Sequence, residues 1–162
     1  MNIVGIGLTV LCLACSLGAS GAPQAEGDGK PEPRANSVGS KLDHSGKRKT
    51  GKASVYARKF HGRKMANGKR MAPHDDNAAS KTLPLGTTAK VTNLETGKTA
   101  QVTIEDRGPY VPGRIVDLAP GTAREIGITP RQGVAPVAVA PIAVPQPDGG
   151  LKKGDGARPS RR

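Results

Sequence analysis

The middle of the chain, from about Thr50 to Pro145, consists of short stretches in which apolar and polar residues alternate. Residues 53–58 place Ala, Val and Ala between Ser, Tyr and Arg, a period of two that is typical of a half-buried strand. Residues 87–94 and 99–106 alternate in the same way around the turn sequence ETGK, so they predict a β-hairpin in which Gly97 adopts the unusual backbone conformation. Residues 113–118 predict a fourth strand.

Two further segments complete the pattern. Residues 120–127 predict a short helix that begins with Pro120 and stops at Gly127, although Ala119 offers no side-chain oxygen to the first amides. Residues 133–145 alternate Val, Ala and Ile but contain prolines, which favours a sheet edge or the seam of a barrel. Several short strands and one helix within roughly 95 residues predict an all-β protein built as a small closed barrel.

The two ends of the chain differ from this middle part in composition. An apolar run from Ile3 to Leu17 is short for a membrane span and precedes small residues, so residues 1–22 are predicted to be a signal peptide, although no Lys or Arg precedes the run. Cys15 is the alternative, a lipidated cysteine. Residues 23–49 predict a disordered linker and residues 146–162 a disordered basic tail. We therefore expect an exported protein of the periplasm or cell envelope, held at the membrane only if Cys15 carries a lipid.

The net charge of the chain indicates which kind of binding partner to expect. The 162 residues carry 25 Lys and Arg against 13 Asp and Glu, a net charge of +12. From Arg48 to Pro145 the balance is 16 against 7, so most of the excess lies on the predicted domain. Such a surface favours an anionic partner: nucleic acid, anionic lipid or an acidic wall polymer. Nucleic acid fits the charge, but neither the predicted export signal nor the few aromatic residues favour it.

The segment EDRGPYVPGRIVDLA, residues 105–119, concentrates candidate chemistry. Asp106 ends a predicted strand before a glycine turn, a position from which a carboxylate can project into a groove as a general acid. The alternative is a structural carboxylate that bonds turn amides and pairs with Arg107. Asp117 ends the next strand, where it either accepts amide hydrogens at the helix start or acts with Asp106 as a second carboxylate. Glu105 is a further candidate for that supporting part.

Two other groups of residues need an interpretation. His61, His74, Asp75 and Asp76 lie close together in the polar segment 60–80, but their spacing matches no recognised metal motif and both cysteines fall in the predicted signal peptide, so we expect no metal. Tyr56, Phe60 and Tyr110 are the only aromatic residues. They either pack in the core or form a platform on which sugar rings stack.

Three stretches together resemble the rare lipoprotein A family of septal-ring lytic transglycosylases. They are GKASVYARKFHGRKMANGKRM, AASKTLPLGTTAKVTNLETGK and VTIEDRGPYVPGRIVDLAPGTAREIGI, and the resemblance covers about Gly51 to Val144. It implies a six-stranded double-psi β-barrel with one or two short helices, shared more distantly with expansins and family 45 glycoside hydrolases.

The resemblance also implies a reaction and a substrate. Family members cleave the bond between N-acetylmuramic acid and N-acetylglucosamine in peptidoglycan, preferably in strands stripped of stem peptides. A single acid protonates the leaving oxygen and then, as a base, helps the muramoyl 6-hydroxyl close a 1,6-anhydro ring, with no cofactor and no metal. The family's catalytic aspartate falls on Asp106. We expect a monomer whose glycan contacts come from these candidates: Tyr56, Asn67, Arg107, Tyr110 and Arg114.

The chain departs from the family pattern at positions tied to activity. Lys69 stands where the family usually reads the glutamate of TANGE, and Ser80 stands where it reads the histidine of TAAHKTLP. The tryptophan of SWYG is Val55. A lysine in place of a glutamate favours the ionised form of a nearby acid, and His74 or Glu105 is a candidate to compensate. Two hypotheses follow: a lytic transglycosylase that uses Asp106, or a module that binds or loosens the wall without efficient catalysis.

Overall fold

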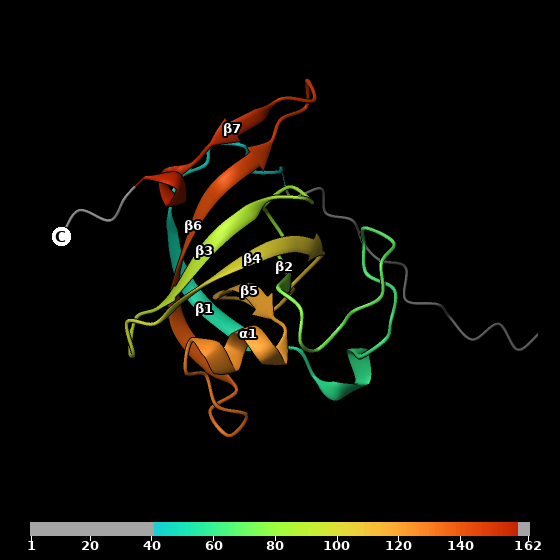
Figure 1. Ribbon diagram of the computed structural model, residues 1–162, viewed down its shortest axis with the longest axis vertical. Coiled ribbons are helices and arrows are strands. Elements are labelled where there is room, and N and C mark those ends of the chain that lie inside the picture. Colours follow the sequence, from blue (N-terminus) through green and yellow to red (C-terminus); the bar gives the residue numbers. More distant parts are fainter. Residues whose placement is uncertain (1–40, 159–162) are drawn as a thin grey trace, which may run out of the picture. The chain divides into compact units, whose positions relative to one another are not determined.

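The structure, a computed structural model, describes residues 41–158. The strands in this part form a single sheet that closes on itself (Figure 1). The strand order is β1-β5-β2-β4-β3-β6-β7, and β1 also pairs with β6. This extra pairing joins the first six strands into a barrel, which confirms the predicted fold class. The predicted signal peptide, Cys15 and residues 23–40 of the predicted linker lie outside the described residues.

The elements follow one another along the chain, and the longest connection, residues 61–76, lies between η1 and β2. In order they are β1 (Lys49–Val55), the 3-10 helix η1 (Arg58–Phe60), β2 (Asn77–Ala79), β3 (Thr88–Asn93), β4 (Thr99–Asp106), β5 (Arg114–Leu118), α1 (Pro120–Glu125), β6 (Val134–Pro145), β7 (Leu151–Lys153) and the 3-10 helix η2 (Asp155–Ala157). Within this described part, no helix is long and apolar enough to cross a membrane.

The predicted hairpin and the predicted helix both form. β3 and β4 pair antiparallel, from Thr88 opposite Thr103 to Thr92 opposite Thr99, and Gly97 in the turn has a φ of 69°. The helix α1 has Pro120 in its first turn and no side-chain cap, while Gly127 beyond its end has a φ of 82°. Local turn chemistry therefore fixes both elements.

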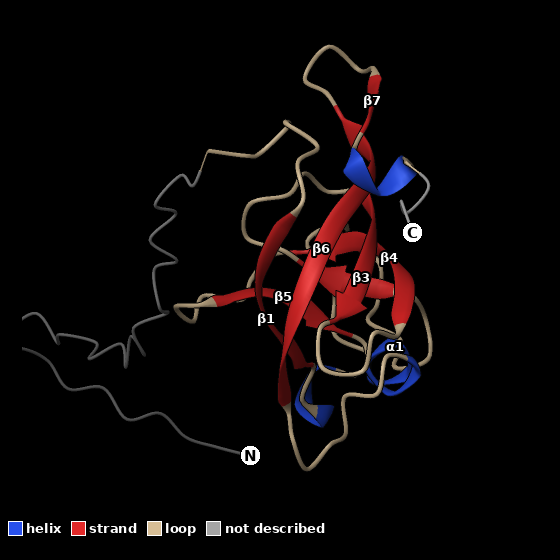
Figure 2. Ribbon diagram, turned by 90° about the vertical axis from the view of Figure 1, so that its left-hand side faces the viewer, coloured by secondary structure: helices blue, strands red, loops and turns tan. Residues whose placement is uncertain are grey.

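The proline-bearing strand β6 is the seam of the barrel. It pairs antiparallel with β1 on one side and with β3 on the other (Figure 2). Pro141, opposite Ala89, lies where the register with β3 shifts, so the missing amide hydrogen falls at an irregularity in the ladder. The core inside the barrel is apolar, with Val91, Ile104 and Leu118 among its fully buried members.

Among the six strands of the barrel, the sequence pattern missed β2. Its three residues, Asn77, Ala78 and Ala79, lie within a segment predicted to be a polar loop, and three residues are too few to show a period of two. All three are buried. β2 pairs parallel with β4 and antiparallel with β5, so it is the strand that joins the two halves of the barrel.

The structure differs from the predicted disorder at both flanks. β7 pairs with the end of β6, and η2 follows it, within the segment predicted to be a disordered tail. On the N-terminal side the amide of Asp43 donates to Thr82 O at 2.7 Å, and the Arg48 amide donates to Asp155 Oδ2 at 2.9 Å. Neither segment has a periodic pattern of its own. Their order comes from hydrogen bonds with partners far away in the sequence.

Gly154 shows how closely these flanks pack. A Cβ on this residue would lie 2.3 Å from Pro141 O and 2.8 Å from Gly46 O, and both are backbone atoms that cannot rotate away. We expect Gly154→Ala to lower the free energy of unfolding by about 1–3 kcal/mol through overpacking. Denaturant unfolding at neutral pH measures this, with Leu151→Ala as a control because Leu151 is 73% exposed. Equal stability of Gly154→Ala and the unmodified chain would contradict the packing of this segment.

The Asp43–Lys49 pair gives a pH signature for the same region. Lys49 Nζ lies 2.7 Å from Asp43 Oδ2, and this lysine, then Ser45, lowers the pKa of Asp43 from 3.8 to about 2. A lowered carboxyl pKa stabilises the fold above pH 3.8 and stops doing so as the pH falls through 2. Because the lysine is half exposed, we expect Asp43→Asn to cost about 0.5–1 kcal/mol at pH 7.

Unfolding curves of Asp43→Asn and of the unmodified chain between pH 7 and pH 2 test this pair. The difference between the two should be constant down to about pH 4 and vanish near pH 2. Glu125→Gln, an exposed change on α1, should show no such pH dependence. A difference that persists at pH 2 would mean that Asp43 acts through something other than its charge.

Candidate functional site

A bulge in β4 places two consecutive carboxylates toward the same loop. Ala78 of β2 pairs with Ile104, but its neighbour Ala79 pairs with Asp106, so Glu105 and Asp106 together stand opposite one residue. In a regular strand they would point to opposite faces of the sheet. Here the Glu105 carboxylate reaches Lys69 and the Asp106 carboxylate reaches Ala66, both in the segment 62–71.

Three hydrogen-bond donors from three segments hold the Asp106 carboxylate. Tyr56, directly after β1, donates its hydroxyl to Oδ2 at 3.0 Å. The amides of Ala66 and Arg107 donate to Oδ1 at 2.9 and 2.8 Å. Oδ1 is thereby occupied by backbone amides, whereas Oδ2 has only the rotatable phenol beside it. Oδ2 is the oxygen of this carboxyl that is suited to carry and exchange a proton.

Tyr56 is a neutral donor fixed against the apolar side of the site. Burial, followed by the negative charges of Asp106 and Asp117, raises the pKa of the Tyr56 phenol. Tyr56 as a whole is 9% exposed, and its ring packs edge-on against Phe60, with 5.9 Å between ring centroids. Two interpretations were open for Tyr56: a buried residue or part of a platform for sugar rings. The structure favours the first, because Tyr56 is buried and its hydroxyl orients Asp106.

The segment 62–71, called here the 62–71 loop, folds over a second apolar cluster next to the barrel. Gly62 and Arg63 exchange backbone hydrogen bonds with Met71, and the Met65 amide donates to Lys69 O at 2.8 Å. Met65 and Met71 are buried against Tyr56, Ala79 and Ala119. This apolar anchor, with the amide of Asn67 donating to Glu105 O at 3.0 Å, brings the loop to the carboxylates.

Glu105 pairs with the lysine that replaces the family's glutamate. Lys69 Nζ lies 2.7 Å from Glu105 Oε1, and the hydrogen bond to this carboxylate, then its charge, raises the pKa of Lys69. The ammonium is therefore neutralised by a carboxylate adjacent in sequence to Asp106. Of the two candidates for compensation, Glu105 makes this contact, whereas His74 lies in a different cavity.

Asp117 is held by other partners and does not share a proton with Asp106. Its Oδ1 accepts from Arg114 Nη2 at 2.6 Å and from the Ser54 hydroxyl. Ala79 of β2 stands between the two aspartates, opposite both, so about 10 Å separates their Cα atoms at ordinary strand spacing. The expectation that Asp117 accepts amides at the helix start is wrong, because α1 has no side-chain cap and Ala119 is its N-cap residue.

Ser80 and Arg107 serve the turn behind Asp106. The buried Ser80 hydroxyl accepts from the Leu83 amide at 3.2 Å. The Arg107 guanidinium donates to Ser80 O and Leu83 O at 3.2 and 2.6 Å. These contacts assign Arg107 to bracing the turn. They also leave Ser80 without any direct contact to the Asp106 carboxylate in the described residues.

The remaining predicted glycan contacts divide in the same way. Asn67 Oδ1 accepts from the Lys69 amide at 2.9 Å and shapes the 62–71 loop, and Arg114 is bound to Asp117. Tyr110 is 74% exposed, directly after the turn at Gly108 and Pro109. Among the predicted contacts, Tyr110 is therefore the side chain that is free to stack on a sugar.

Two neighbouring cavities meet at Tyr56. The first, called here the Asp106 cavity, has a volume of about 190 Å³ and is lined by Tyr56, Phe60, Arg63, Lys64, Met65, Met71 and Asp106. The second has a volume of about 540 Å³ and is lined by Val55, Tyr56, Arg58, His61, Pro73, His74, Pro120, Arg124 and Pro130. Within residues 41–158 no three His, Cys, Asp or Glu side chains gather as metal ligands would.

These features define the chain as a closed six-stranded β-barrel protein with one oriented carboxylate in the wall of the Asp106 cavity. Its family model is described as lytic transglycolase and matches residues 48–139, more than half of the chain. The chain belongs to this family, and its barrel is the double-psi β-barrel that the resemblance implied.

Named relatives agree with the family match. Over 98 residues the chain is 43% identical to the endolytic peptidoglycan transglycosylase RlpA of Vibrio cholerae, which covers 60% of this chain and 37% of that protein. The RlpA protein of Pasteurella multocida is 49% identical over 84 residues, 52% of this chain and 29% of that protein. A Clavibacter michiganensis expansin structure shares 23% identity with a TM-score of 0.46, covering 59% and 50% of the two chains. The chain thus spans well under half the length of these RlpA relatives.

The bond between Tyr56 and Asp106 is measurable by a double-mutant cycle. We expect Tyr56→Phe and Asp106→Ala to be coupled by about 1–2 kcal/mol in the free energy of unfolding, because each removes the same charge-assisted hydrogen bond. Denaturant unfolding of the four proteins gives this number. The matched control is the cycle of Tyr110→Phe with Asp106→Ala, which should give no coupling. A coupling near zero for Tyr56 would contradict the described contact.

Proposed function

We propose that this protein cleaves the glycan strands of peptidoglycan as a lytic transglycosylase, with Asp106 as the single acid and base. The observation that carries the proposal is the Asp106 carboxylate itself, held by Tyr56 and two backbone amides at the wall of a cavity in a lytic transglycolase barrel. The names of the RlpA relatives support the same substrate class.

The reaction needs one carboxyl group in two protonation states. Protonated at Oδ2, Asp106 gives its proton to the glycosidic oxygen as the bond from this oxygen to C1 of the muramoyl unit breaks. The resulting carboxylate then takes the proton of the muramoyl 6-hydroxyl while that oxygen bonds to C1. The products are a 1,6-anhydro end and a free 4-hydroxyl end, and Asp106 regains its proton.

The neighbours of Asp106 have supporting parts in this scheme. The Tyr56 hydroxyl and the Ala66 and Arg107 amides meet the carboxylate formed after the first proton transfer and fix its orientation. Glu105 neutralises Lys69, so the lysine does not act on Asp106 as an uncompensated cation. The negative charge of Asp117 is compensated by the ion pair with Arg114, so Asp117 takes no part in the proton transfer.

The same proposal places the protein outside the cytoplasm, where peptidoglycan lies. It is supported by the apolar run from Ile3 to Leu17 with small residues after it, and by the net charge of +12, which suits an anionic wall. Whether the chain is released by cleavage near residue 22 or carries a lipid on Cys15, the folded residues act in the cell envelope.

A second candidate function is a wall-binding or wall-loosening module on the same barrel. Two observations favour it: Ser80 is buried and bonded to the Leu83 amide, and Lys69 is occupied by Glu105, so neither offers a further acid or base to Asp106. The surface charge and the exposed Tyr110 would serve binding as well as catalysis.

The test is mass spectrometry of purified peptidoglycan after incubation with the protein. We expect fragments with 1,6-anhydro ends, and we expect Asp106→Asn to lower their rate of formation by about 10²–10⁴-fold because the acid is lost. Asp148→Asn, an exposed change in the β6–β7 turn, is the matched control and should keep the rate. Unchanged glycan together with co-sedimentation with the wall would support the binding module and reject the transglycosylase.

A further inference from the structure

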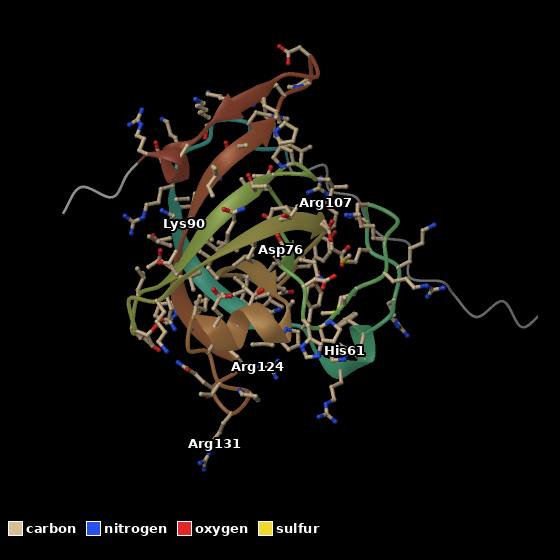
Figure 3. The ribbon with its side chains drawn as sticks, in the orientation of Figure 1. His61, Asp76, Lys90, Arg107, Arg124 and Arg131 are labelled. Atoms are coloured by element: carbon tan, nitrogen blue, oxygen red, sulfur yellow. The ribbon has the colours of Figure 1, made fainter. Side chains whose placement is uncertain are left out.

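The larger of the two cavities is rich in cationic and imidazole side chains from separate parts of the chain. Arg58 comes from η1, His61 and His74 from the two ends of the segment that includes the 62–71 loop, and Arg124 from α1. We call it the arginine cavity. Figure 3 shows His61 and Arg124 near η1 and α1, while Arg131 extends away from the fold beyond them.

The arginine cavity carries an uncompensated positive charge. None of its lining residues is Asp or Glu, and the described part of the chain contains no ion pair that neutralises Arg58 or Arg124. Pro73, Pro120 and Pro130 stiffen its wall. Its volume of 540 Å³ lies within the range of about 300–1,000 Å³ of small-molecule sites.

The position of the arginine cavity links it to the proposed chemistry. Tyr56 lines both cavities, and its hydroxyl bonds Asp106 on the side of the smaller one. The shared residue makes the arginine cavity the neighbour of the cavity that contains Asp106, on the other side of Tyr56. Two guanidinium groups recognise carboxylates through paired, charge-assisted hydrogen bonds.

We propose that the arginine cavity is a carboxylate-binding subsite that holds an acidic group of the glycan strand beside the bond to be cleaved. This inference rests on the proposed function for its substrate. The carboxylate has two possible sources: the lactyl group of a muramic acid that bears no peptide, or a carboxylate of an attached stem peptide. In a substituted strand the lactyl carboxyl is an amide and carries no charge, so the two sources are chemically distinguishable.

The experiment measures binding, so that its result does not depend on catalysis. Glycan strands of three kinds are used: strands stripped of peptide, strands with peptide, and stripped strands whose carboxyl groups are converted to methylamides. Binding is measured in the Asp106→Asn background, which leaves the strands uncut. Asn keeps a side-chain oxygen that can accept from the Ala66 and Arg107 amides.

The test variant is Arg58→Gln with Arg124→Gln, and the matched control is Arg131→Gln, an exposed arginine outside the lining. We expect the double variant to lose about tenfold or more in affinity for stripped strands, and the control to lose nothing. On methylamide strands the parent and the double variant should bind equally. Both arginines are exposed, so the double variant is expected to remain folded.

The three kinds of strand distinguish the two sources of the carboxylate, and they separate failure of the subsite from failure of the proposed function. A loss confined to stripped strands identifies the lactyl carboxylate, and a loss confined to peptide-bearing strands identifies the stem peptide. Equal binding of the double variant and its parent to all strands would overturn the subsite. If the unmodified protein releases no anhydro fragments while the arginine dependence of binding holds, the transglycosylase proposal fails and the subsite stands.

Discussion

The pairing of β6 with two strands at once is the constraint on which the rest of the structure depends. β6 meets β1 along one side and β3 along the other, and this converts an open sheet into a closed barrel. Closure satisfies both edges and encloses an apolar interior filled by residues such as Val91, Val102 and Ile104. Since the interior is filled, polar chemistry has room only on the outer face and at the strand ends.

That outer face acquires its site through a bulge in β4 and the loop that packs beside it. The bulge at Glu105 and Asp106 turns both carboxylates toward the 62–71 loop, and Ala79 of β2, opposite Asp106, is buried in the same apolar cluster as Met65 and Met71. The loop is kept in place by Met65 and Met71, which bury themselves on Tyr56. The apolar cluster thus positions the donors that hold Asp106, so packing and chemistry at this site are the same set of contacts.

The charges around the site are arranged so that one carboxylate is available and the others are paired. Glu105 is bound by Lys69 and Asp117 by Arg114, whereas the described hydrogen bonds to the Asp106 carboxylate all come from neutral donors. A reaction that uses the substrate's own hydroxyl as nucleophile requires one proton-carrying group and no second base for water. The replacement of a glutamate by Lys69 is compatible with this arrangement because the neighbouring Glu105 supplies the opposite charge.

The sequence by itself determined the elements whose signals are local. Alternation predicted β3, β4 and β6, Gly97 predicted the hairpin turn, Pro120 and Gly127 predicted α1, and the family motifs predicted the double-psi barrel and singled out Asp106.

Tertiary structure alone decided the other features, because they depend on pairings between distant residues. β2 is too short for a periodic signal and forms only between β4 and β5. The segments 41–48 and 151–158 are ordered by contacts with each other and with β6, and the partnership of Lys69 with Glu105 joins residues 36 positions apart. Such contacts carry no sequence period, so only the folded chain brings them together.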